Sequence, residues 1–175
     1  MARGVRARKT GKRKSAPLRR LLWEGVMPGP DMPALTLYAH PFSSYCQKAL
    51  IAFYEKGVPF EQALLAPENP KAGEALAALW PIGRFPVLVA GGRTIPEASI
   101  LIEYVDALAP PASLIPVDPD AALEARLLDR VFDNYVMTPM QAIVGDALRP
   151  EGSHDPHGVA QAHALLERAY GWLET

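Results

Sequence analysis

One loop combines a hydroxyl group, a thiol and the start of a predicted helix, and it is the segment best suited to chemistry. Residues 41–46 of this loop read PFSSYC. Backbone N–H groups and the helix dipole stabilise negative charge at a helix N-terminus and lower the pKa of a thiol there. Ser43 and Cys46 have the spacing of a C-x-x-C redox motif whose attacking cysteine is a serine, so no internal disulfide cycle can run. The Ser43 hydroxyl can instead donate a hydrogen bond to the thiolate of another molecule; the alternative is an ordinary helix N-cap.

A second segment, residues 83–88 (GRFPVL), places a proline at the start of a predicted strand, after a glycine-containing turn. A cis peptide bond before Pro86 would expose the backbone N–H and C=O of Phe85, and an extended peptide ligand could pair with them as an added strand. The alternative is a trans proline that simply begins a strand. The segment therefore predicts either a peptide-binding edge or a plain strand boundary.

The third segment, residues 94–99 (TIPEAS), brings a carboxylate and free amides to the start of another predicted helix. This combination suits a ligand with adjacent α-amino and α-carboxylate groups. Glu97 would bind the ammonium group, and the backbone N–H of Ala98 would bind the carboxylate. The alternative is that Glu97 is a solvated acid in the first turn of the helix.

An alternating order of strands and helices positions these segments. Hydrophobic alternation predicts a strand over 35–39, and the spacing i, i+3, i+4, i+7 predicts a helix over 44–56. The other expected strands are 60–65, 87–90 and 93–95, the last two joined by a two-glycine turn, and the other helices are 71–80 and 98–108. This order requires a mixed sheet of four strands, with the first pair parallel and the last pair antiparallel.

The second half of the sequence predicts helices alone. A proline-rich linker over 109–118 ends at Asp118, which has the features of an N-cap with proline at the first helical position. The helix that follows is expected to break near Thr138-Pro139, and a last helix is expected over 158–173 after a loop at 150–157. The side chains expected to pack inward are Leu128, Val131, Phe132, Tyr135, Ala162, Leu165, Leu166, Ala169 and Trp172, with Trp80 also in the core.

Charge is distributed unevenly along the chain. The first 20 residues carry nine basic and no acidic side chains, whereas the rest carries nine basic against 19 acidic side chains. We expect a disordered basic leader over 1–34, with a true start at Met32 as an alternative. The acidic folded body is poorly suited to binding nucleic acid, and no apolar run is long enough to span a membrane.

The single cysteine limits the chemistry further. One cysteine forms no intrachain disulfide and no cysteine-based metal site, and it is compatible with a reducing, cytoplasmic compartment. Cys46 shares the apolar stripe of its predicted helix, so we expect it to be buried, with a raised pKa and low reactivity. The pair His154 and His157 lies in a loop without a third ligand, and we expect no metal site there.

Taken together, three segments resemble the glutathione S-transferase family. They are LTLYAHPFSSYCQKALIAFYEKGVPFE from Leu35, PIGRFPVLV from Pro81 and PEASILIEY from Pro96. The resemblance covers residues 35–119 closely and the rest loosely. It implies an α/β thioredoxin-like domain over 35–108 and part of an all-α domain over 119–175, whose helical region is shorter than the family's. It also implies a cis-Pro86 and a cytoplasmic homodimer.

The resemblance also implies an activity and its site residues. Glutathione would be a co-substrate, with no other cofactor and no metal, and its thiolate would attack a hydrophobic electrophile. Ser43 would be the catalytic thiolate-stabilising residue, Phe85 and Pro86 would pair with the peptide backbone, and Glu97 and Ala98 would bind the γ-glutamyl end. Ala98 departs from the family's usual serine, which removes one hydroxyl contact. The electrophile pocket is expected to include Phe42, Tyr135, Met137 and Met140.

Two alternatives stay open at this point. A non-catalytic module of the same family would bind a ligand or a protein partner, and Ala98 and the short helical region favour it. A glutathione-dependent isomerase or peroxidase would share the binding site and differ only in the pocket for the second substrate.

Overall fold

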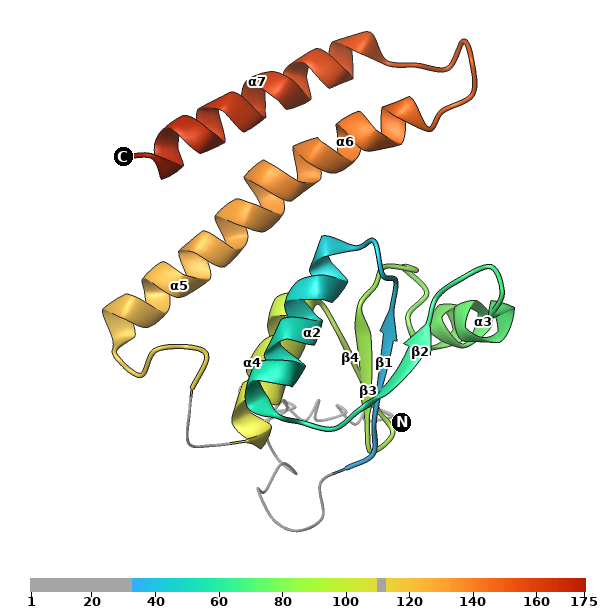
Figure 1. Cartoon of the computed structure of the whole chain (residues 1–175), viewed down its shortest axis with the longest axis vertical. Helices are drawn as coiled ribbons and strands as arrows, with labels where there is room; N and C mark the ends of the chain where they lie inside the picture. The colour runs from blue at the N-terminus through green and yellow to red at the C-terminus, as the bar shows by residue number, and fades with distance from the viewer. Residues whose placement is uncertain (1–32, 110–112) are drawn as a thin grey trace, which may run out of the picture.

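The computed structural model describes residues 33–109 and 113–175, and it consists of a small sheet covered by helices and a separate helical half (Figure 1). The expected leader over 1–34 lies almost entirely outside the described residues, so that prediction stays untested. No helix in the described ranges is both long and apolar enough to cross a membrane.

The sheet has four strands in the spatial order β2-β1-β3-β4. They are β1 (Leu35–Ala39), β2 (Glu61–Leu64), β3 (Val87–Ala90) and β4 (Arg93–Pro96). The β1–β2 pair is parallel, and the β1–β3 and β3–β4 pairs are antiparallel. The mixed thioredoxin-like sheet expected from the order of elements is therefore confirmed.

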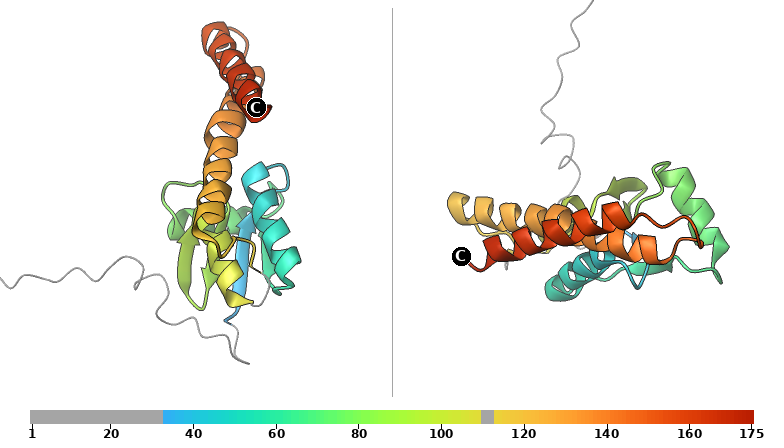
Figure 2. Two further views of the ribbon diagram at one scale, coloured as in Figure 1. Left: turned by 90° about the vertical axis from the view of Figure 1, so that its left-hand side faces the viewer. Right: turned by 90° about the horizontal axis from the view of Figure 1, so that it is seen from above.

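Helices cover both faces of the sheet. α2 (Ser44–Lys56) and α4 (Ala98–Leu108) pack side by side on one face, and α3 (Pro70–Leu79) lies at the other (Figures 1 and 2). The larger core cluster joins β1, α2 and α4, and a smaller one joins α3 to β3. Alternate residues of β1 serve the two clusters, since Leu37 belongs to the first and Tyr38 packs against the second.

Local chemistry explains where these elements begin and end. The Ser43 side chain accepts a hydrogen bond from the backbone N–H of Cys46 and caps the start of α2. Gly57, with φ of 62°, ends that helix in the left-handed conformation that glycine adopts without cost. Gly91 and Gly92 have φ of 54° and 84°, as the tight turn between β3 and β4 requires.

The helical half contains one long, continuous helix and one returning helix. α5 (Pro119–Val131), the π-helical segment η1 (Phe132–Met137) and α6 (Thr138–Ala147) follow each other without a break, and α7 (Pro156–Leu173) packs against α6. The expected interruption near Thr138-Pro139 is therefore present, but as a π-helical segment within a continuous helix and not as a gap in it. Pro139 lacks a backbone N–H and crowds the preceding turn, and the chain accommodates it by widening that turn into η1.

The inward-facing residues of this half are fewer than the hydrophobic pattern predicted. Val131, Ala162 and Ala169 are buried, but Phe132, Tyr135 and Trp172 are 46%, 50% and 50% exposed. Leu128, Leu165, Leu166 and Trp80 are half-buried. Two packed helices bury only a narrow strip of each surface, so large side chains beside that strip remain in contact with solvent.

The segment that enters the helical half is held by a single carboxylate. Asp106 in α4 accepts hydrogen bonds from the Ser113 hydroxyl and the Leu114 N–H, and it pairs with Lys56 at 2.9 Å. Burial raises the pKa of Asp106, but these hydrogen bonds outweigh it and hold the pKa below its ordinary value. The start of the helical half is thereby tied to α2 and α4.

Candidate functional site

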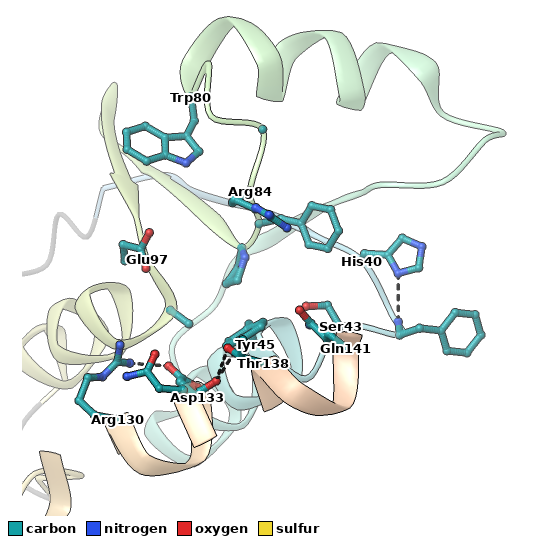
Figure 3. Close-up of a pocket in the computed structure, with 16 residues that line it drawn as sticks. His40, Ser43, Tyr45, Trp80, Arg84, Glu97, Arg130, Asp133, Thr138 and Gln141 are labelled. Carbon is teal, nitrogen blue, oxygen red and sulfur yellow. Dashed lines mark hydrogen bonds and ion pairs between the residues drawn. The ribbon is translucent and has the colours of Figure 1, made fainter. Parts of the chain in front are cut away.

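A cleft of about 550 Å³ opens between the sheet domain and the long helix of the helical half (Figure 3). Its volume lies in the range of small-molecule sites. The five residues predicted for the site all line it, namely Ser43, Phe85, Pro86, Glu97 and Ala98. Three segments far apart in the sequence therefore meet in one cavity, as the sequence motifs predicted.

Ser43 lies at the start of α2 and is only 7% exposed. Its Oγ accepts a hydrogen bond from the Cys46 backbone N–H at 3.3 Å. A serine hydroxyl has two acceptor lone pairs and one proton to donate, so this contact leaves the proton available. The two roles considered for Ser43, helix cap and thiolate donor, are thus compatible.

The peptide bond between Phe85 and Pro86 is cis, as predicted. The loop before α2 lies against Phe85, because the His40 ring stacks on the Phe85 ring with centroids 5.8 Å apart. The His40 Nδ1 in turn accepts the backbone N–H of Phe42 at 3.2 Å. These contacts hold the 40–43 loop beside the start of β3, so that both segments line the same side of the cleft.

Glu97 adopts an unusual backbone conformation at the start of α4. Its φ of 72° is positive, the only such value for a non-glycine residue among the described residues, and its side chain makes no capping hydrogen bond. Such strained residues cluster at ligand sites. The first amides of α4 have no partner within the helix. The start of α4 therefore offers a carboxylate and free N–H groups to the cleft.

Ser99 does not supply the hydroxyl that Ala98 lacks. The Ala98 side chain is buried at the cleft, whereas the Ser99 hydroxyl donates to Asp129 Oδ2 at 2.6 Å, on the side of α4 that contacts α5. This agrees with the different direction of two consecutive side chains on a helix.

Cys46 is fully buried and does not line the cleft. Burial raises the pKa of its thiol, and hydrogen bonds with the His40 backbone and the Ser43 side chain only partly oppose this. The prediction that Cys46 is a packing residue with a raised pKa is confirmed.

The opposite wall of the cleft is polar, which sequence reasoning missed. Phe42 lines the cleft as expected and is 93% exposed, but Tyr135, Met137 and Met140 do not line it, so that part of the pocket prediction is wrong. The long helix instead presents a row that we call the polar stripe: Arg130, Asn134, Thr138 and Gln141. These residues follow a spacing of three or four, which marks one helix face. That spacing is a readable signal in the sequence, but the hydrophobic residues beside it predict a different inner face.

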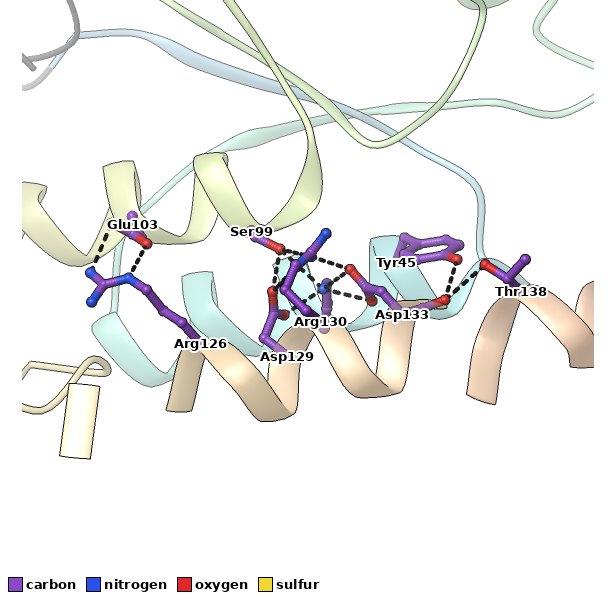
Figure 4. A network of polar contacts seen from close by, with 9 residues as sticks. Tyr45, Ser99, Glu103, Arg126, Asp129, Arg130, Asp133 and Thr138 are labelled. Carbon is purple, nitrogen blue, oxygen red and sulfur yellow. Dashed lines mark hydrogen bonds and ion pairs between the residues drawn. The ribbon is translucent and has the colours of Figure 1, made fainter. Parts of the chain in front are cut away.

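A network of charged side chains fixes the face that the long helix turns to the cleft (Figure 4). Lys48 of α2 contacts Asp129 Oδ1 at 2.6 Å and Asp133 Oδ2 at 2.7 Å. Arg130 pairs with Asp129 at 2.7 Å and also contacts Asp133 and Ser99. The network thus joins α2, α4 and α5 at the base of the cleft.

Hydrogen bonding outweighs burial within this network. Burial raises the pKa of Asp129, but hydrogen bonds from Lys48, Ser99 and Arg130 bring it below its ordinary value. Further along, the Tyr45 hydroxyl and the Thr138 hydroxyl both donate to the Asp133 carbonyl oxygen, at 3.3 Å and 2.9 Å. The polar stripe therefore runs from the start of α4 toward the start of α2.

No metal-binding group of three His, Cys, Asp or Glu side chains occurs in the part of the chain that the structure describes.

Comparison with known proteins identifies relatives of the sheet domain. Residues 37–113 match the family described as glutathione S-transferase, N-terminal domain. Glutathione S-transferase U6 of Arabidopsis thaliana is 34% identical over 108 residues, which is 61% of this chain and 46% of that protein. A stringent starvation protein A homolog of Pasteurella multocida is 34% identical over 54% of this chain and 43% of that protein. The chain thus spans about half the length of these curated relatives.

Solved structures extend the similarity into the helical half. A glutathione S-transferase from Methylobacillus flagellatus, solved with glutathione bound, is 27% identical with a TM-score of 0.72, covering 80% of this chain and 68% of that one. A theta class enzyme from Xanthomonas axonopodis pv. citri, also with glutathione bound, is 29% identical with a TM-score of 0.62, covering 82% and 72% of the two chains. The domain match, the thioredoxin-like sheet and these neighbours agree: residues 37–113 form a glutathione S-transferase N-terminal domain, and the fold of the described chain is similar to that of solved glutathione S-transferases.

Proposed function

We propose that this protein is a glutathione transferase, which joins the thiolate of glutathione to an electrophilic second substrate. The observation that best supports this is that Ser43, Phe85 and Glu97 line one cleft, each within two residues of the start of a helix or strand. The similar structures with bound glutathione from other organisms point the same way.

Glutathione is an extended tripeptide with one ammonium and two carboxylate groups, and the cleft has a group for each. The Glu97 carboxylate takes the ammonium, and the first amides of α4 take the neighbouring carboxylate. The backbone of Phe85 pairs with the central residue. Arg84 lines the cleft and has no ion-pair partner among the described residues, so it is available for the other carboxylate.

The chemistry rests on the sulfur lying near Ser43. The helix dipole of α2 and the Ser43 hydroxyl favour the thiolate over the thiol, so the thiol proton leaves to solvent. The sulfur lone pair then forms a bond to the electrophilic carbon of the second substrate, and the electron pair of the bond that breaks leaves with the displaced group. Ser43 keeps its own proton throughout and acts as a hydrogen-bond donor.

The alternative is a non-catalytic glutathione-binding or interaction module. Two observations favour it: Ala98 contributes no hydroxyl to the cleft, and one of the similar proteins carries a name other than transferase. A protein of this kind would bind glutathione or a partner without turning over an electrophile.

One experiment separates the two functions. The full chain and a form starting at Met32 are passed over immobilised glutathione and then assayed for conjugation with an electrophile panel that includes an aryl halide. Retention together with turnover supports the transferase. Retention without turnover of any electrophile supports the binding module, and absence of retention contradicts both glutathione-based roles.

A further inference from the structure

His40 lies between two segments of the sheet-side wall and contacts both of them (Figure 3). It is the first residue after β1, it is half-buried, and it lines the cleft. Its ring stacks on the Phe85 ring, with centroids 5.8 Å apart and an interplanar angle of 26°. His40 therefore lies between the loop that carries Ser43 and the strand start that carries Phe85.

The main chain of His40 already fixes part of this loop. The Ser43 backbone N–H donates to the His40 carbonyl oxygen at 3.1 Å, and the His40 backbone N–H donates to Cys46 Sγ at 3.4 Å. Because these bonds use no atom of the imidazole, they remain when the side chain is replaced. The imidazole itself has two contacts to explain, the stacking on Phe85 and the hydrogen bond from Phe42.

The hydrogen bond from Phe42 requires an uncharged ring. The Phe42 backbone N–H donates to His40 Nδ1 at 3.2 Å. A ring nitrogen accepts a hydrogen bond only when it carries no proton, so this contact belongs to the neutral imidazole with its proton on Nε2. In the charged ring both nitrogens carry protons, and the Phe42 N–H meets a second donor. The stacking on Phe85 survives protonation, since a cation is also attracted to an aromatic face.

The groups around His40 offer the charged ring nothing in exchange. The titratable and charged side chains on the neighbouring elements are Tyr45 and Cys46 of α2, Arg84 before β3 and Glu97 before α4. Within the ranges that the structure describes, none of them forms a hydrogen bond or an ion pair with the imidazole. Protonation therefore removes one contact from the loop without supplying another.

We propose that His40 is a positioning residue that makes glutathione binding depend on pH, which rests on the proposed function. Neutral His40 holds the Phe42 N–H and keeps the 40–43 loop against Phe85, so that Ser43 and the Phe85 backbone present one fixed surface to glutathione. In weak acid a proton from the solvent takes the Nδ1 lone pair. The loop is then released from the ring, and glutathione binds less tightly.

Two variants at position 40 separate the two contacts of the ring. In His40→Asn the side-chain oxygen takes the place of Nδ1 and accepts the Phe42 N–H at every pH, whereas His40→Phe keeps an aromatic ring for stacking and has no acceptor. His163→Asn replaces an exposed histidine of α7 that does not line the cleft and is the control.

Glutathione affinity is measured by titration calorimetry between about pH 5 and about pH 8, the range in which histidine changes charge. Relative to His40→Asn, the wild type and His163→Asn should lose affinity about tenfold from the upper to the lower limit, as for one lost hydrogen bond. Titration of Glu97 and of glutathione itself is common to all four proteins and cancels in this comparison. His40→Phe should bind about tenfold more weakly than the wild type at the upper limit.

A second measurement needs neither glutathione nor a variant. The amide resonance of Phe42 is followed by NMR in the ligand-free wild type over the same pH range, and it should shift as the hydrogen bond to Nδ1 is lost. An unchanged resonance would overturn the role of His40, as would equal pH profiles of affinity in the wild type and His40→Asn. If the resonance shifts but the wild type binds no glutathione at any pH, the proposed function fails, and the dependence of binding on His40 fails with it.

Discussion

The two walls of the cleft are built from different parts of the polypeptide. On the sheet side, Ser43, Phe85 and Glu97 lie just before the first residues of a helix, a strand and a helix, where the first N–H groups of the two helices have no partner within the helix. On the helical side, the wall is one face of a continuous helix whose backbone groups are already paired, so only side chains such as Asn134 and Gln141 can make contacts.

This difference separates two tasks. The sheet-side wall combines backbone groups at helix and strand starts with the side chains of Ser43 and Glu97, and it suits a ligand that stays the same. On a wall made of side chains, a single substitution changes the contacts offered to a ligand, so this wall suits a ligand that differs between relatives. We therefore assign glutathione to the sheet side and the second substrate to the helical side, and each experiment below tests that division.

The largest expected effect is that of Ser43→Ala on turnover. Loss of one hydrogen-bond donor at the developing charge should lower kcat for conjugation by about 10²-fold. Glutathione affinity should change far less, because Glu97 and the backbone groups remain. Steady-state kinetics with a glutathione titration measure both quantities. Ser44→Ala is the matched control, since the Ser44 Oγ is buried without a hydrogen-bond partner; an equal loss in that variant would deny Ser43 its special role.

The next effect concerns recognition on the same wall. Glu97→Gln should weaken glutathione binding by about 1.5–3 kcal/mol, the range for a hydrogen bond to a charged group. Titration calorimetry measures the change. Glu124→Gln in α5 makes an identical substitution away from the cleft and should bind normally. Unaltered affinity in Glu97→Gln would mean that the γ-glutamyl end lies elsewhere.

How well each wall could be predicted follows from the same contrast. Ser43, Pro86 and Glu97 were found because proline, glycine and capping residues mark local geometry within a few positions of themselves. The helical wall depends on which face of the long helix turns inward. That face is set by the contacts of Lys48 with Asp129 and Asp133, which lie 81 and 85 residues further along the chain. Hydrophobic periodicity alone predicts instead an inward face that includes Phe132 and Tyr135.

The third prediction concerns Lys48, whose ion pairs connect the sheet domain to the helical wall of the cleft. Among the described residues, Lys48→Met leaves Asp129 and Asp133 with Arg130 as their one cationic partner, and it should lower the free energy of unfolding by about 1–3 kcal/mol. Conjugation should fall more than glutathione affinity, since the helical wall loses its anchor while the sheet-side wall is unchanged. Chemical unfolding and binding assays report the two effects. Lys71→Met, an exposed lysine in α3, is the control. Loss of glutathione affinity in step with conjugation would contradict independent walls.

The smallest expected effect is a dependence of stability on pH. Because the pKa of Asp129 is lowered in the folded protein, its contribution to stability is complete above the ordinary unfolded value of about 3.9. That contribution is lost as the pH falls through the lower, folded pKa. Urea unfolding over a series of acidic pH values should therefore show a steeper loss of stability in the wild type than in Asp129→Asn. Parallel curves of stability against pH for the two proteins would show that Asp129 does not contribute to the acid dependence of stability.

The central claim, that the sheet-side wall holds glutathione with its sulfur at Ser43, is tested most directly by the ionisation of bound glutathione. Ultraviolet absorption of the thiolate is followed against pH in the saturated complex, for the wild type and for Ser43→Ala. We predict that binding lowers the pKa of the glutathione thiol below its value in free solution, and that Ser43→Ala reverses much of this change. A bound thiol that titrates as it does in free glutathione would contradict the account.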